Sequence, residues 1–386
     1  MTARRTLKRL IRARMSKTGE AYTTARRHLL RSAGDSLMNN ATNLLQQAAA
    51  AAERGDLTML ATLLADSPEV LTGRDGDGET LLGLACRAAT GGVAIPPVAG
   101  TPAQHAAVDA IIAAGADPDA GNQEGWTPLH SAAMAGHVEL TRRLLAAGAA
   151  LDSGLYGSRG GTPLALALFY AKQDAAELIA QPATPNNLRH AAALGRDLSP
   201  FVSGTGELTA QASESLDWAA PNWFPEWQRS LSEQEVLDEA LTWAARNGQC
   251  GSMVTLVELG ADVNANPFRG TALLWAIYSD DVQAATWLLD AGADPDLRHD
   301  FGGAGHGVSA VAMHLAAQHG GMGCLRLLVE RGADRTIVDG SHGGTPQGWA
   351  EFGGAGEAAA YLRGLGCHGA GGGVLPPAVP VVQMST

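Results

Sequence analysis

The stretch Gly125-Trp126-Thr127-Pro128-Leu129-His130-Ser131-Ala132-Ala133-Met134-Ala135-Gly136-His137 decides the fold of this chain. Thr127 is a residue type that caps helix N-termini, and Pro128 follows at the first helical position, where its missing N–H costs nothing. Gly136 can end this short helix in the left-handed conformation. A second helix is predicted by the apolar spacing that follows, at Leu140, Leu144 and Leu145. The stretch therefore predicts a pair of short helices.

A three-residue phrase marks the end of each predicted pair and shows that the pair is repeated. Its copies begin at Gly115, Gly148, Gly260, Gly292 and Gly332, and Ala follows in every case. The first two copies lie 33 residues apart and the third and fourth lie 32 apart, which is the period of stacked helix-pair repeats. Such arrays present a long binding face and require no built-in chemistry.

The tetrapeptide Thr127-Pro128-Leu129-His130, the following Ala132-Ala133 and the Gly-Ala-Asp exits resemble the ankyrin repeat. The resemblance is closest over 121–153 and extends, in weaker copies, over about four fifths of the chain. It implies an all-α ankyrin-repeat solenoid of eight or nine helix pairs in two blocks, with short β-turn fingers. In this family the histidine of the tetrapeptide makes structural hydrogen bonds, which is the role expected of His130 and His314.

The positions of the repeats divide the chain into five parts. We expect a basic helical segment over 1–40, a first repeat block over 41–203, a Trp/Pro-rich insertion over 204–232, a second block over 233–366 and a disordered Gly/Pro tail over 367–386.

The resemblance also implies the function, a non-catalytic scaffold whose concave face and finger loops bind a macromolecular partner, most simply a protein. The family's binding positions correspond in the clearest repeat to Asn122, Glu124, Trp126, Ser131, Met134 and Ala135. Comparable positions further along the chain are held by Pro267, Phe268, Arg269, Trp275, Tyr278 and Ser279. All of these are expected on the fingers or on the exposed side of the first helices.

Aromatic residues concentrate in the insertion, which contains Trp218, Trp223, Phe224 and Trp227. Tryptophan is enriched where protein interfaces are strongest, so the insertion is a candidate interaction loop. The same rings could instead fold back and fill the groove between the two repeat blocks, because exposed tryptophan clusters promote aggregation. The sequence leaves both interpretations open.

Charge is distributed unevenly along the chain. The net charge is −12, yet residues 1–32 hold ten Lys and Arg residues against a single acid, Glu20. An alternative function is therefore an acidic adaptor or neutralising protein tethered to nucleic acid. The candidate contacts are Arg4, Arg5, Lys8, Arg9, Arg12 and Arg14. The same segment could bind an anionic membrane surface or an acidic protein, or rest on the acidic body of the chain itself.

No motif for catalysis, for a cofactor or for a metal emerges from the sequence. The glycines over 302–307 lack the spacing and the Lys-Ser/Thr of a phosphate loop, and His306, His314 and His319 lack the spacing of paired metal ligands. Four scattered cysteines without a Cys-x-x-Cys pair favour a reducing compartment. With no apolar run near the ~20 residues of a membrane span and no apolar stretch after the basic start, we expect a cytoplasmic protein.

Overall fold

The computed structural model describes residues 12, 13, 15, 17, 18, 24, 41–90, 100–155, 161–180, 187–213, 232–267, 270–300 and 308–366. The chain forms two compact units. The first contains residues 1–91 and 98–123, and the second contains residues 92–97 and 124–386.

The first unit consists of two helix pairs joined by a segment that contains a short 3-10 helix. A helix over 41–54 pairs with α3 (Leu57–Asp66), and α4 (Leu81–Thr90) pairs with α5 (Pro102–Ala113), with the 3-10 helix η1 (Pro68–Leu71) between the pairs. Thr101 begins α5 with a capping box, in which its side chain and that of Gln104 bond to each other's backbone N–H. This cap satisfies two of the donors that a helix start leaves without partners.

The acidic loop before α4 is a hydrogen-bonded turn. The Asp75 carboxylate accepts from the backbone N–H groups of Asp77 at 3.0 Å and Glu79 at 2.8 Å. The Arg74 guanidinium donates to the carbonyls of Gly78 and Gly121, both at 2.6 Å, and so joins this turn to the next one in the first unit. The acidic residues here are used by the turn itself.

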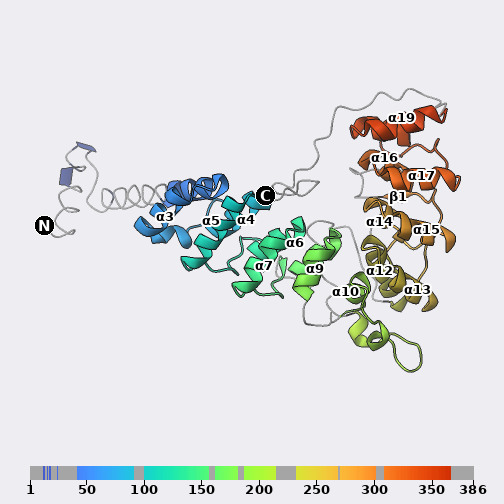
Figure 1. The fold of residues 1–386 in the computed structure, drawn as a ribbon, viewed down its shortest axis with the longest axis horizontal. Coiled ribbons are helices and arrows are strands. Elements are labelled where there is room, and N and C mark those ends of the chain that lie inside the picture. The colour runs from blue at the N-terminus through green and yellow to red at the C-terminus, as the bar shows by residue number, and fades with distance from the viewer. Residues whose placement is uncertain are drawn as a thin grey trace. The chain divides into compact units, whose positions relative to one another are not determined.

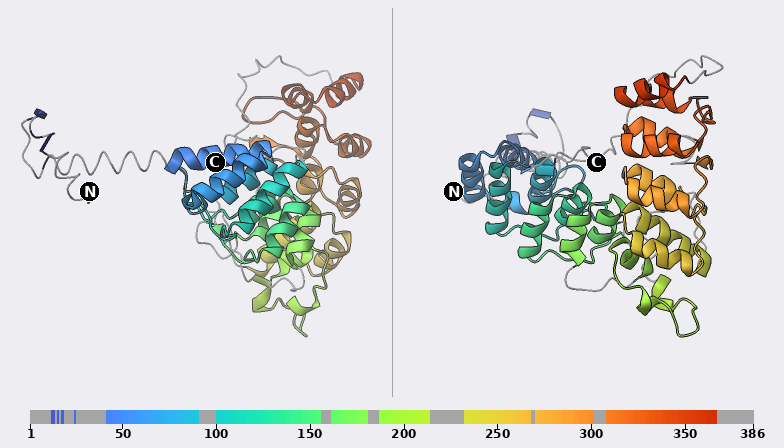
Figure 2. Two further views of the ribbon diagram at one scale, coloured as in Figure 1. Left: turned by 60° about the vertical axis from the view of Figure 1, so that its left-hand side comes forward. Right: turned by 45° about the vertical axis from the view of Figure 1, so that its right-hand side comes forward.

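The second unit continues the helix pairs (Figures 1 and 2). The first helices are α6 (Pro128–Ala135), α8 (Pro163–Phe169), α10 (Leu188–Ala193), α12 (Glu233–Arg246), α14 (Ala272–Tyr278), α16 (Ala312–His319) and α18 (Pro346–Phe352). The second helices are α7 (Val138–Ala146), α9 (Gln173–Ala180), α13 (Cys250–Glu258), α15 (Val282–Asp290), α17 (Met322–Glu330) and α19 (Gly356–Gly364).

First helices pack on first helices and second helices on second helices, so the pairs form two layers. Contacts join α12 to α14, α14 to α16 and α16 to α18 in one layer, and α13 to α15, α15 to α17 and α17 to α19 in the other. The predicted all-α class is confirmed, with eight complete helix pairs and one first helix, α10, that lacks a second helix in the described residues. A short antiparallel ribbon, β1 (His299–Asp300) with β2 (Val308–Ala310), precedes α16.

A turn residue with positive φ ends each first helix and fixes the register of the repeats. In the second unit these residues are Gly136, Ala171, Gly195, Gly248, Asp280, Gly320 and Gly354. An alanine lies four positions before each of them, at Ala132, Ala167, Ala191, Ala244, Ala276, Ala316 and Ala350, and all are at most 1% exposed. A small side chain at this point lets neighbouring first helices approach closely, which is why the array tolerates no larger residue there.

The repeat that begins with α10 differs from the others. After α10 the described chain forms two 3-10 helices, η3 (Ser199–Phe201) and η4 (Ala210–Ser213), and a single bridge between Val202 and Leu208. Phe201 is fully buried and belongs to one hydrophobic cluster that runs from Leu188 to Leu362. This cluster, and the packing of α10 on α12, continue on both sides of the insertion, so the block boundaries derived from the sequence remain a prediction.

Several sequence predictions fall outside the described residues. These are the roles of Arg4, Arg5, Lys8, Arg9, Arg14, Trp218, Trp223, Phe224, Trp227, Phe268, Arg269 and His306, and the disorder of the tail over 367–386. Of the six basic residues proposed to contact nucleic acid, Arg12 is described, and it is exposed.

Candidate functional site

The tetrapeptide histidines serve the fold, as the sequence predicted. His130 is fully buried, its Nδ1 accepts from the backbone N–H of Thr127 at 3.1 Å, and its Nε2 lies 3.0 Å from the carbonyl of Gly161 in the next repeat. His314 repeats this pattern with Val311 and Gly344. Burial lowers the pKa of His130 to about 4, so both rings are neutral connectors between repeats at pH 7.

The position two residues before each turn residue differs in chemistry from repeat to repeat. It holds Met134, Phe169, Ala193, Arg246, Tyr278, Gln318 and Phe352. The alanine two residues before this position is the same in all seven repeats, because close packing requires a small side chain. The turn residue, two residues after this position, is a glycine in five of the seven, because its φ is positive. The array thus keeps its scaffold positions constant and varies the side chains at the ends of its first helices.

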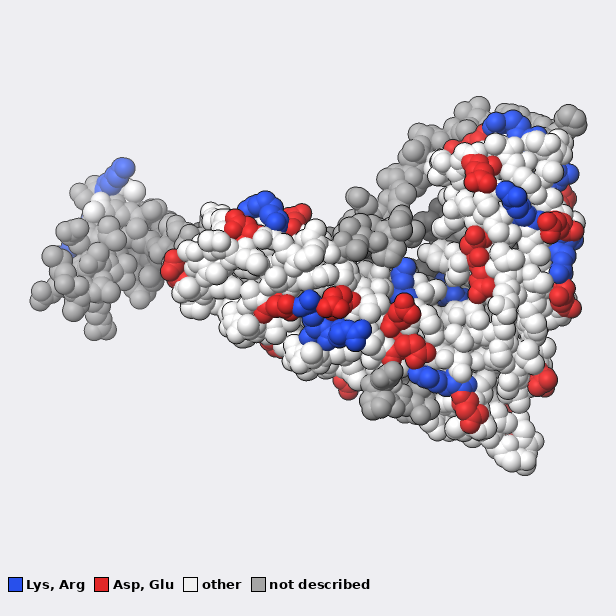
Figure 3. Space-filling view, viewed as in Figure 1, with Lys and Arg blue, Asp and Glu red and all other residues white. Residues whose placement is uncertain are grey.

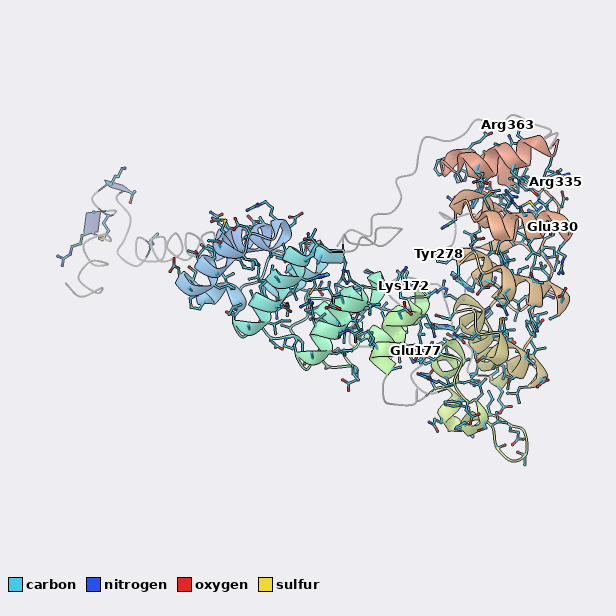
Figure 4. All side chains as sticks on the ribbon, viewed as in Figure 1. Lys172, Glu177, Tyr278, Glu330, Arg335 and Arg363 are labelled. Atoms are coloured by element: carbon cyan, nitrogen blue, oxygen red, sulfur yellow. The ribbon has the colours of Figure 1, made fainter. Side chains whose placement is uncertain are left out.

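The centre of this row is an aromatic cluster around one buried guanidinium. The Arg246 guanidinium carbon lies 3.4 Å from the ring centroid of Trp275, 3.9 Å from that of Phe169 and 5.6 Å from that of Tyr278. Tyr170 packs edge-on against Phe169, with ring centroids 5.2 Å apart. We call Arg246, Phe169, Tyr170, Trp275 and Tyr278 the Arg246 cage. The cage joins α8, α12 and α14. Tyr278 is labelled in Figure 4.

Arg246 has no ionic partner within the described part of the chain. The residue is 4% exposed, no carboxylate lies within 4.0 Å of its guanidinium, and Nε has no hydrogen-bond partner there. Burial lowers the pKa of Arg246 to about 9, and the nearby Tyr278 and Tyr170 oppose that effect. The group therefore stays charged at pH 7. Stacking on aromatic faces provides the attraction that holds it, at about 2 kcal/mol for a desolvated pair.

A second buried arginine in the same region has a carboxylate partner, although its Nε, like that of Arg246, has no hydrogen-bond partner in the described residues. Arg189 on α10 donates to Glu239 on α12 at 3.0 Å, and the two side chains are 1% and 2% exposed. The Arg189 guanidinium also lies 4.6 Å from the centroid of Trp243, whose ring is 6.0 Å from that of Phe169. Trp243 and Phe169 thus link the surroundings of the two arginines.

Backbone strain occurs next to the cage. The residues with positive φ that are not glycine at the ends of α8 and α14 are Ala171, with φ of 52°, and Asp280, with φ of 49°. Ala171 directly follows Tyr170, and Asp280 lies two residues after Tyr278. Such conformations cost about 1–3 kcal/mol each outside glycine. The carboxylate of Asp280 offsets part of this cost by accepting from the backbone N–H of Cys324 at 2.9 Å.

The structure places the described predicted binding residues in several environments. Ser131, Met134 and Tyr278 are half-buried on first helices, and their binding role remains a prediction. Trp126 is half-buried with its ring 5.9 Å from that of His130, Glu124 is exposed, and Asn122 belongs to the first unit. The exposed position expected for Trp275 is wrong: it is 5% exposed, because its ring stacks on Arg246.

Sequence reasoning missed three residues of the Arg246 cage, Phe169, Tyr170 and Arg246, and also the adjacent Trp243. A signal for them was present, because Phe169 and Arg246 occupy the same position before the turn residue as Met134 and Tyr278. Counting back from Gly248 would have found Arg246. Ala171 in place of glycine concealed the same register in α8.

Charged side chains on the surface are of both signs and are scattered over the helices in Figure 3. Within the described ranges, no group of three or more His, Cys, Asp or Glu side chains is arranged to hold a metal ion. Among the same residues, no helix combines the length and the apolar character that crossing a membrane requires.

Two family models match this chain. A model of three ankyrin repeat copies matches residues 100–189, and a single ankyrin repeat model matches residues 270–300 and 311–340. The helix α12, which carries Trp243 and Arg246, lies in the interval between these matches.

Three curated proteins show the same relationship. The chain is 30% identical over 183 residues to the ankyrin repeat domain-containing protein SAT10 of Stachybotrys chartarum, covering 43% of this chain and 9% of that protein. It is 37% identical over 166 residues to the ankyrin repeat and SOCS box protein 16 of Mus musculus, covering 40% and 34%. The chain therefore spans much less than two thirds of either relative.

The third relative is cyclin-dependent kinase inhibitor 2A of Monodelphis domestica, with 33% identity over 132 residues, 34% of this chain and 73% of that protein. The chain covers 73% of this relative, and the family models match the chain over 100–189, 270–300 and 311–340. The chain belongs to the ankyrin repeat family.

Proposed function

We propose that this protein is a non-catalytic scaffold that binds a protein partner through the ends of its first helices in the second unit. Ankyrin repeats generally mediate protein–protein interaction, and one relative is named as an inhibitor of a kinase. The single observation that carries the proposal is the alternation within the array. Buried alanines and turn residues recur in every repeat, while the side chain between them changes from Met134 to Arg246 to Tyr278 to Gln318.

Variation at one repeated position is what recognition of an irregular partner surface requires. A partner that lies along the first helices would meet a different side chain at each repeat, and a few of these would supply most of the affinity. Met134 and Tyr278 are suited to this role, because a thioether and a phenol ring both bury apolar area while they remain partly exposed in the free protein.

The experiment begins with a partner captured by the full-length chain, identified and purified. Its affinity is then measured by calorimetry for the wild type, for Met134→Arg and for Arg142→Ala. Met134 lies at the end of α6, whereas Arg142 is an exposed residue on the second helix α7 and serves as the matched control. We expect Met134→Arg to weaken binding at least tenfold and Arg142→Ala to leave it unchanged. Equal affinity for all three proteins would contradict the proposal.

The tether to nucleic acid is not carried forward as a second function. Neither the family matches nor the three relatives support it. It predicts a steep fall of affinity for DNA with added salt, by a slope of about −0.9 per phosphate contact on logarithmic axes. If the full-length protein showed this salt dependence of DNA binding and the protein without residues 1–32 did not, the nucleic-acid function would be supported.

We further propose that the protein works in a reducing compartment such as the cytoplasm. Cys86, Cys250 and Cys324 are free, and Cys86 and Cys324 are buried. Burial raises the pKa of Cys86 to about 12, so that its thiol stays protonated and behaves as a small apolar side chain. A full count of free thiols in protein isolated without reductant tests this assignment.

A further inference from the structure

The Arg246 guanidinium is buried among aromatic rings, and the described part of the chain supplies no carboxylate to it. A guanidinium that is 4% exposed has lost nearly all its water, and aromatic rings replace only part of that solvation. Arg189 shows how this array satisfies such a group when the charge serves the fold, since it is paired with Glu239 at 3.0 Å. Arg246 has the same burial and no such carboxylate.

We propose that the Arg246 cage is the anchor site for one acidic side chain, an Asp or Glu, of the protein that binds along the first helices. The proposal rests on the binding function proposed above and adds its chemistry. A carboxylate that enters between the partly exposed Tyr170 and Tyr278 meets the planar fork of the guanidinium, which favours bidentate pairing. The tyrosine hydroxyls can donate to the same oxygens.

The charge balance favours a carboxylate over a phosphate. The cage supplies one positive charge inside a chain whose net charge is −12. A single carboxylate neutralises that charge, whereas a phosphate dianion would leave a negative charge buried against aromatic rings. Burial of an uncompensated charge is strongly unfavourable.

The site can be tested with a small probe and no knowledge of the partner. The full-length protein, labelled with ¹⁵N in arginine, is titrated with N-acetyl-glutamate N-methylamide at constant ionic strength. The neutral N-acetyl-glutamine N-methylamide and inorganic phosphate are titrated in parallel. The Nε–H signal of Arg246 is identified by its loss in Arg246→Lys, and the tryptophan fluorescence, to which Trp243 and Trp275 contribute among the eight tryptophans of the chain, is recorded on the same samples.

We expect a saturable shift of the Arg246 signal with the glutamate derivative, with a dissociation constant in the millimolar range, and none with the glutamine derivative. In Arg246→Lys the fluorescence response to the probe should weaken at least tenfold. The matched control is Arg326→Lys, whose guanidinium stacks at 5.4 Å from Tyr361 but lies on the surface and is paired with Glu357. This variant should respond as the wild type does.

Three outcomes would overturn the proposal. An unchanged Arg246 signal with every probe means that the cage is a purely structural cation stack. A response to phosphate at lower concentration than to the carboxylate assigns the site to a different ligand. An equal response to the glutamine derivative means that charge is not recognised.

The failure of this proposal and of the scaffold function can be told apart. If Met134→Arg weakens the partner while Arg246→Lys does not, the scaffold function stands and the anchor is refuted. If the probe binds the cage but Met134→Arg leaves the partner unaffected, the anion site stands and the binding surface lies elsewhere.

Discussion

Two neighbourhoods of the second unit treat buried polar groups in opposite ways. In the repeats around His130 and His314, and at the Arg189–Glu239 pair, each buried group meets a partner of matching chemistry on the adjacent repeat. In the Arg246 cage a charged group meets aromatic rings and no carboxylate of the described residues. Buried polar groups in this array are therefore of two kinds: some join one repeat to the next, and one keeps a charge to which the described residues supply no opposite charge.

The largest effect is expected from breaking the paired arginine. Arg189→Met leaves Glu239, which is 2% exposed, as a buried carboxylate without its cation. We expect a loss of about 3–5 kcal/mol in the free energy of unfolding, measured by urea denaturation. The double variant Arg189→Met with Glu239→Leu should regain most of this loss. A single variant that is as stable as the wild type would show that the pair is not what joins α10 to α12.

The next effect concerns the neutral histidine and depends on pH. The pKa of His130 is lowered from 6.5 to about 4 by burial, so the unfolded chain binds more protons than the folded one between these values. Stability must therefore fall as the pH drops from about 6.5 and level off near 4, by about 3 kcal/mol in total. His130→Asn removes this pH-dependent contribution, because an asparagine side chain does not titrate. Asparagine is chosen because its Oδ1 can still accept from the backbone N–H of Thr127. Urea titrations at pH 7 and pH 4 measure the difference, and parallel losses in both proteins would refute it.

A smaller effect tests the strained turn beside the cage. Ala171, with a φ of 52°, occupies the turn position after α8 that Gly136 occupies after α6. Ala171→Gly relieves that strain but gives the unfolded chain more freedom, and we expect a net gain of about 0.5–1 kcal/mol. The reverse change, Gly136→Ala, should lose stability. Thermal unfolding of both variants decides the point, and a loss from Ala171→Gly would mean that the turn is not strained.

The smallest effect on the free energy of unfolding is expected from replacing Arg246, which has no carboxylate partner in the described residues. Arg246→Met removes a desolvated cation together with its attraction to the rings, and the two contributions oppose each other. We expect an unfolding free energy within about 1 kcal/mol of the wild type, against the large loss in Arg189→Met. A loss as large as that of Arg189→Met would erase the distinction between the two arginines and assign Arg246 to the fold.

Much of this architecture can be read from local sequence, and the cage cannot. Thr127, Pro128 and Gly136 each impose a backbone geometry on their own, so the helix pair follows directly, and the Gly-Ala-Asp phrases give its period. Counting back from Gly248 finds the repeated position that Arg246 occupies, but it does not show what surrounds the guanidinium. Its surroundings come from Phe169 and Trp275, which lie far from it in sequence and reach it only through the stacking of three repeats. Trp275 was placed on the surface for the same reason.

The repeat that begins with α10 has a mechanical consequence. In a linear array, each unit is held only by its two neighbours, so resistance to pulling equals that of the weakest junction. Across α10 the described chain has no second-layer helix, and α10 packs extensively on α12 but only narrowly on α8, so the junction between α8 and α10 has the least packing among the described first helices of the second unit. Force applied along the array should open it there first. The flanking stacks would then separate as intact pieces.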